Sequence, residues 1–138
     1  MNDINYQLRV SYKTALDSTG IPSYYQEAPP NVKHDQYIIF RSISGRDESA
    51  KCGADVKTSV TVEIHTRQSV VNSGSLADLA ADLVFGAIYP DKANRIQIVG
   101  ADVLATEMTM DETIDWKVNG GEKWISRYIT FQHYINIL

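Results

Sequence analysis

The segment from Val56 to Thr66 alternates residue by residue between apolar or β-branched side chains and polar ones. Successive side chains of a β-strand point to opposite faces of a sheet, so this strand has one dry face and one wet face. A shift of one residue in its pairing would turn the dry set to water, so its register is tightly specified. We therefore expect a central strand of an antiparallel sheet. The dry face would carry Val56, Thr58, Val60, Val62 and Ile64, and the wet face Lys57, Ser59, Thr61, Glu63 and His65.

The bulk properties fit one globular domain spanning residues 1–138. A formal net charge of -4 argues against a protein whose main partner is nucleic acid, because phosphate binding usually needs a basic face. Cys52 is the only cysteine, which rules out an intramolecular disulfide. The sequence has no apolar run of the roughly 20 residues that span a bilayer and no signal-peptide pattern at Met1, so we expect a protein of a reducing cytoplasm.

Two segments have the apolar spacing of amphipathic helices. The first covers about residues 4–17 and ends before Gly20 and Pro22. The second begins at Ser75 and ends at Tyr89-Pro90. We expect both to lie on the sheet as core cover. The expected buried stripes are Leu8, Tyr12, Ala15 and Leu16 in the first helix, and Leu76, Leu79, Ala80, Leu83 and Val84 in the second.

The remaining segments divide into loops and strands. We expect a proline-containing loop over residues 21–35, and a strand over 36–44 whose continuous apolar start suits cover on both faces. Residues 44–54 are polar, include Gly45 and Gly53, and are expected to form a long loop to the central strand. Residues 91–100 are compatible with either an edge strand or a turn.

The C-terminal part predicts a long β-hairpin with arms over residues 101–118 and 122–137. The arms flank Asn119-Gly120, the strongest short-range hairpin signal. In the second arm His133 falls on the isoleucine-rich face, which suggests a buried imidazole with hydrogen-bond partners. The resulting fold class is α+β: a mainly antiparallel sheet with two helices packed on one face and a long C-terminal hairpin.

The sequence offers no motif for catalysis or for a cofactor. It has no phosphate-binding loop, nucleophile elbow or dinucleotide fingerprint. The three histidines, His34, His65 and His133, match no metal-ligand spacing. The acidic run 111–115 is better explained as a solvated part of the hairpin than as paired catalytic carboxylates.

In the order helix, strand, polar loop, strand, helix and hairpin, the chain resembles the small tail-terminator or tail-completion proteins of long-tailed bacteriophages, also called head–tail joining proteins. The likeness covers nearly the whole chain. It rests on the N-terminal helix followed by the strand Gln36–Arg41, on the strand Val56–Thr66 with Arg67 after it, on the helix Leu76–Ile88, and on the strand Trp124–Gln132.

The resemblance implies a structural protein and not an enzyme. It implies a homo-oligomeric ring, usually of six subunits, which ends tail-tube polymerisation and joins the tail to the head connector. The implied partners are further copies of the chain, the tail-tube protein and a head-completion or connector protein, with DNA passing through the lumen without specific binding. The implied location is the neck region of a virion assembled in the host cytoplasm, with no cofactor and no membrane.

We expect subunit or tail-tube contacts in two places, because their length, polarity and flanking glycines are not explained by roles in a compact core. The polar loop would contribute Arg46, Asp47, Glu48 and Lys51. The hairpin would contribute Met108, Met110, Trp116 and Trp124.

Two alternatives remain open at this point. A tail-tube subunit or another connector ring protein would also be α+β with a long hairpin, but a tube subunit would polymerise into filaments. A small α+β enzyme or ligand-binding domain would need a cavity with convergent polar groups, for example around Glu107, Tyr128 and His133.

Overall fold

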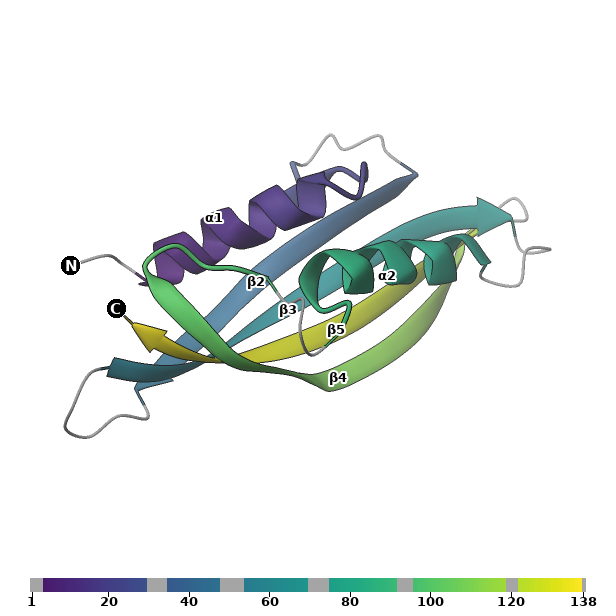
Figure 1. Ribbon diagram of the computed structural model, residues 1–138. Helices are drawn as coiled ribbons and strands as arrows, with labels where there is room; N and C mark the ends of the chain where they lie inside the picture. Colours follow the sequence, from purple (N-terminus) through teal and green to yellow (C-terminus); the bar gives the residue numbers. More distant parts are fainter. Residues whose placement is uncertain are drawn as a thin grey trace.

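The computed structural model describes residues 4–29, 35–47, 54–69, 75–91, 96–118 and 122–137. These residues form two helices and five strands, and the strands make one sheet in the order β1-β2-β3-β5-β4 (Figure 1). The elements in chain order are α1 (Ile4–Asp17), β1 (Ser23–Tyr25), β2 (Gln36–Asp47), β3 (Ala54–Ser69), α2 (Ser75–Ile88), β4 (Ala101–Val118) and β5 (Glu122–Ile137).

Strand β3 is the centre of the sheet, as its alternating sequence predicts. It pairs antiparallel with β2 on one side and with β5 on the other, and its pairing with β5 runs from Ala54 to Ser69. Val60, Val62 and Ile64 are at most 1% exposed, whereas the described wet-face residues are only partly buried. The predicted separation into a dry and a wet face is confirmed, and the α+β fold class with it.

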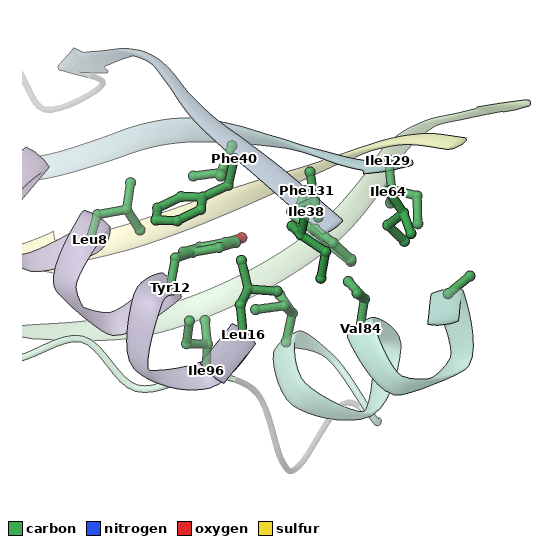
Figure 2. Packing of buried hydrophobic residues seen from close by; sticks show 14 of the residues in the cluster. Leu8, Tyr12, Leu16, Ile38, Phe40, Ile64, Val84, Ile96, Ile129 and Phe131 are labelled. Atoms are coloured by element: carbon green, nitrogen blue, oxygen red, sulfur yellow. The ribbon is translucent and has the colours of Figure 1, made fainter. Parts of the chain in front are cut away.

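Both helices lie on the dry face of the sheet, and the core fills the space between (Figures 1 and 2). Helix α1 has the predicted bounds and buries Leu8, Tyr12 and Leu16 completely. The ring of Tyr12 stacks on Phe40 of β2 with 6.3 Å between the ring centroids. Helical spacing therefore identifies the buried face of α1 correctly.

A small polar network lies inside this core, around His133 of β5. The hydroxyl of Tyr12 lies 2.5 Å from Nε2 of His133, and Oγ1 of Thr106 lies 2.9 Å from Nδ1. A neutral imidazole satisfies both contacts, because one ring nitrogen donates and the other accepts. Burial raises the pKa of Tyr12 well above its usual value, so the phenol keeps its proton. The predicted buried imidazole with partners is confirmed.

Thr58 of β3 and Thr106 of β4 lie on either side of His133 in the sheet, but they differ in their hydrogen bonding. Both threonines pair with His133 in the strand register, Thr58 from β3 and Thr106 from β4. Thr58 is fully buried, yet its Oγ1 has no hydrogen-bond partner in the described part of the chain. The hydroxyl of Thr106 therefore has a hydrogen-bond partner in His133, whereas the hydroxyl of Thr58 has none among the described residues.

The buried face of α2 differs from the predicted one. Leu76, Leu79 and Leu83 are 46%, 61% and 50% exposed. The helix instead turns toward the sheet a face of small residues with two larger ones near its end, namely Ala77, Ala80, Ala81, Val84 and Ile88. Small side chains allow a close approach of helix to sheet, and this packing outweighs the greater hydrophobicity of the leucines. The leucine stripe expected to be buried was therefore wrong at three of its five positions.

Two loop predictions also need correction. Residues 23–25 of the expected loop over 21–35 form β1, a three-residue strand parallel to β2, so the sheet is mostly but not wholly antiparallel. The expected loop over 44–54 is shorter, because β2 continues to Asp47 and β3 begins at Ala54, with an irregularity in pairing between Ile43 and Arg46. Backbone pairing thus extends past Gly45, whose flexibility had suggested a loop.

Residues 96–100 form no strand, and their buried residues Ile96 and Ile98 close one end of the core. The long hairpin is present, with pairing between β4 and β5 from Ala101 and Ile137 to Val118 and Glu122. The less regular alternation of its first arm corresponds to register shifts between Val103 and Ala105 and between Met108 and Met110. The predicted Asn119-Gly120 turn lies outside the described residues. Neither described helix is long and apolar enough to cross a bilayer.

Candidate functional site

The face of the sheet opposite the helices carries a row of aromatic rings that crosses four strands. Tyr24 of β1 contacts Tyr37 of β2 at 6.5 Å between ring centroids. Tyr37 contacts His65 of β3 at 5.0 Å and Trp124 of β5 at 5.9 Å, and His65 contacts Tyr128 at 6.2 Å. We call these five residues the aromatic row. All five are partly exposed, and both described helices lie on the other face.

A shallow hollow of about 350 Å³ opens over the aromatic row, lined by Tyr37, His65, Trp124, Ser126 and Tyr128. A chain of hydrogen bonds across three strands starts from two of these lining residues, Ser126 and His65. Ser126 Oγ lies 2.8 Å from His65 Nδ1, and His65 Nε2 lies 3.2 Å from Glu63 Oε1. Glu63 Oε2 in turn accepts from Arg41 Nε at 2.8 Å. These bonds fix the orientation of the His65 ring between Tyr37 and Tyr128.

The electrostatics of the hollow follow from Glu63. The hydrogen bond with His65 holds the pKa of Glu63 below its ordinary value of 4.5, burial opposes this effect, and the charge of Arg41 adds to it. The pKa of Tyr37 is raised, first by burial and then by the negative charge of Glu63. Glu63 is therefore an ionised carboxylate and Tyr37 a neutral phenol at neutral pH, which makes Tyr37 a hydrogen-bond donor at the rim.

The order serine, histidine, carboxylate has the connectivity of an activated nucleophile. The setting does not suit that chemistry. Ser126 is only 3% exposed and sits in mid-strand, paired with His65 on one side and with Ile114 on the other. The sheet ladders engage the neighbouring backbone groups, so this stretch presents no free pair of N–H groups to hold an oxyanion. The arrangement favours a rigid, preorganised binding surface.

Strand β4 forms one edge of the sheet. Met108 is 47% exposed and Ile114 is 41% exposed, and Met110 is partly buried. Met108 and Met110 flank a register shift, so they point to different faces: Met108 pairs with Phe131 of the core face, and Met110 with Thr130 of the outer face. Bulges and charged residues are common means of limiting unwanted pairing at sheet edges.

An ion-pair cluster around Arg127 ties α2 to this edge strand. Arg127 Nε lies 2.9 Å from Oδ1 of Asp111, and its Nη2 lies 2.8 Å from Oδ2, which is a two-point contact. Its Nη1 lies 3.5 Å from Asp78 of α2, and its guanidinium lies over the ring of Phe85 at 5.6 Å. The hydrogen bonds to Asp111 raise the pKa of Arg127 further above its ordinary value, against the effect of burial.

The structure does not gather the predicted contact residues into one site. Trp124 belongs to the aromatic row, whereas Met108 and Met110 lie on the β4 edge. Arg46 and Asp47 are the last two residues of β2, and Trp116 belongs to β4. The structure describes the backbone of these three residues but not their side chains. Glu48 and Lys51 lie outside the described residues.

The cavity considered around His133, Tyr128 and Glu107 does not form. His133 points into the core, Tyr128 belongs to the opposite face, and Glu107 is exposed on β4. Tyr128 and His133 are an odd number of positions apart on one strand, so their side chains lie on opposite faces of the sheet and cannot converge. Among the side chains that the structure describes, no group of three or more His, Cys, Asp or Glu residues is placed to hold a metal ion.

Comparison with known proteins adds one finding. No protein-family model matches the sequence, and no curated protein matches it. A chain in the solved structure "Virion of native gene transfer agent (GTA) particle" superimposes on this chain with a TM-score of 0.69, covering 99% of this chain and 99% of that chain at 14% sequence identity. The two chains share a fold. The match extends from end to end, so it includes both helices, the central strand and the long hairpin.

Sequence reasoning had placed Glu63 and His65 on a wet face but had not brought them together with other groups. The missing information was strand register, which sets Tyr37 opposite His65 and His65 opposite Ser126. The one available signal was the number of rings at polar-face positions of the predicted strands. Polar strand positions seldom need several aromatic residues unless these contact one another or a partner.

Proposed function

We propose that this chain is a structural protein of a phage-like virion, and that it forms a ring at the head-proximal end of the tail. The single observation that carries the proposal is the full-length fold match to a chain of a gene transfer agent virion. The order of elements, which resembles that of tail-terminator proteins, supports the finer assignment. In this role the ring ends tail-tube polymerisation and joins the tail to the head connector, and it works without catalysis.

The proposed ring has six subunits, and its partners are the tail-tube protein and a head-completion or connector protein. A ring requires head-to-tail contacts that use two different surfaces of each subunit. The chain provides several exposed surfaces for such contacts: the aromatic row, the β4 edge and the leucines of α2. A formal charge of -4 suits a lumen that DNA crosses without being bound.

The aromatic row is our first candidate for a protein contact. Rigid aromatic side chains with a hydrogen-bonding rim are frequent energetic centres of interfaces. We expect Trp124→Ala to weaken assembly by about 2 kcal/mol or more if it contributes such a centre. Tyr134→Ala is a matched control, because Tyr134 is also partly buried on the outer face but lies near Lys57, away from the hollow.

The terminator role is tested by adding the purified chain to its own tail-tube protein during polymerisation. The expected result is short tubes, each with a ring at one end, whose length falls as more of the chain is added. Incorporation of the chain along the whole tube would identify a tube subunit. Tubes of unchanged length with no bound chain would contradict the proposal.

A further inference from the structure

The outer edge of β4 is a long stretch of backbone available for pairing. Residues 105–118 pair with β5 on one side, and β4 is the last strand of the described sheet on the other. Glu107, Met108, Thr109 and residues 111–114 are all exposed. An open edge of this length presents a row of N–H and C=O groups that can add a strand from another chain.

The charges on β4 argue against pairing with the same strand of a second copy. Residues 105–118 contain four acidic residues, Glu107, Asp111, Glu112 and Asp115, against one basic residue, Lys117. A two-fold pairing of β4 with β4 would bring these carboxylates together, and like charges on facing strands are destabilising. Arg127 already pairs with Asp111, and the remaining carboxylates favour a different strand over a second β4.

The other edge of the sheet contains a different open strand. Strand β1 covers only Ile38–Phe40 of β2. Directly after β1, Gln26 donates its backbone N–H to the carbonyl of Phe40 at 2.9 Å and takes a φ of 69°, an unusual value for a residue other than glycine, and the pairing of β1 with β2 ends at Tyr25. Residues 41–47 of β2 are thereby left without a strand on their outer side in the described part of the chain. With Arg41 paired to Glu63 in the same subunit, this stretch carries no excess of negative charge that would repel β4.

The strand directions also suit this pairing. Strand β2 is antiparallel to β3, β3 to β5, and β5 to β4, so β2 and β4 run in opposite directions. When the sheet of one subunit continues into the next, β4 meets β2 of its neighbour in the antiparallel sense. The two edges are different surfaces of one subunit, which is the condition for a closed ring.

We propose that residues 41–47 of β2 pair antiparallel with a stretch of equal length within residues 105–118 of β4 in a second copy of this chain, so that the sheets of neighbouring subunits are continuous. This inference rests on the proposed ring assembly and names the surfaces that form it. It assigns to Gln26 the role of ending β1 early enough to leave β2 open.

Cysteine cross-linking tests the contact. In a Cys52→Ser background, Ser42→Cys on β2 is combined with Met108→Cys or with Thr113→Cys on β4, and the assembled protein is treated with a short bismaleimide. All three positions belong to the helix face of the sheet, because Ser42 pairs with Val60, Met108 with Phe131 and Thr113 with Arg127. We expect at least one pair to give a ladder of cross-linked species that ends at the mass of the ring. Each single-cysteine variant, and a control pair of Ser42→Cys with Leu79→Cys on α2, should give no ladder.

Each other outcome has a defined meaning. Closed rings in negative-stain images without a ladder would overturn the edge pairing and leave the ring intact. Dimers from Met108→Cys or Thr113→Cys alone would show β4 pairing with itself, which also overturns the inference. Absence of both rings and ladders, with and without tail tubes, would overturn the edge pairing and the proposed function together.

Discussion

The two threonines that flank His133 should respond with opposite signs to the same substitution. Thr106→Val removes the Oγ1 that lies 2.9 Å from His133 Nδ1 and leaves a buried ring nitrogen without that partner. Leaving a buried polar group unsatisfied costs about 1–3 kcal/mol. Thr58→Val removes a fully buried hydroxyl that has no partner in the described chain, and replaces it with an apolar methyl of similar size. Relief of that desolvation should stabilise the fold by about 1 kcal/mol.

Urea unfolding followed by circular dichroism measures both effects against the parent protein. The two variants should differ by about 2–4 kcal/mol in the free energy of unfolding, since one loses a satisfied contact and the other an unsatisfied group. Thr106→Ser keeps the hydroxyl and serves as the control for the loss of the methyl group alone. Equal changes of the same sign in Thr106→Val and Thr58→Val would refute the assignment of the hydrogen bond to Thr106.

Three further predictions concern the helices, the ion pairs and the pH dependence. On α2, Leu79→Gln should change the free energy of unfolding by less than about 0.5 kcal/mol, because the side chain is 61% exposed. Ala81→Leu should cost about 1–3 kcal/mol, because it overpacks a fully buried position. Similar costs for the two variants would contradict the orientation of the helix. Arg127→Met should lower the free energy of unfolding clearly, because it leaves Asp111 without its ion-pair partner. Asp78→Asn should cost less than about 0.5 kcal/mol, since the side chain of Asp78 is 73% exposed. Equal losses of stability in the two variants would contradict the pairing of Arg127 with Asp111. The pKa of Glu63 is lowered in the folded state, so its stabilising contribution is complete above the ordinary value of 4.5 and is lost as the pH falls through the folded value. Stability measured from pH 7 to pH 3 should therefore fall less in Glu63→Gln than in the parent, and identical profiles would rule out this contribution.

The sequence carries most of the fold in local patterns. Alternation in residues 56–66 identifies the central strand because one register alone buries Val60, Val62 and Ile64. Gly20 with Pro22, and Tyr89-Pro90, mark the helix ends because Gly20 takes a positive φ of 78° and proline has no backbone N–H to continue a helix. The features that failed depend on distant parts of the chain: β1 has three residues and a parallel partner, and the buried face of α2 is chosen by how closely the helix approaches the sheet.

The candidate site is less accessible from sequence for the same reason. Periodicity places Glu63 and His65 on the outer face, but their partners Arg41, Ser126 and Tyr37 come from two other strands. Only the pairing register brings these groups within contact distance, and register is a property of the whole sheet. Periodicity also places Trp124 on the outer face, yet it does not show that this face holds a hollow.

Native mass spectrometry with negative-stain imaging measures the mass and shape of the purified protein in solution, and so tests ring formation itself. We expect one discrete closed ring of six subunits, either alone or after addition of tail tubes. Filaments of indefinite length would contradict termination and identify a tube subunit. A monomer that stays monomeric and ignores tail tubes would contradict the ring itself.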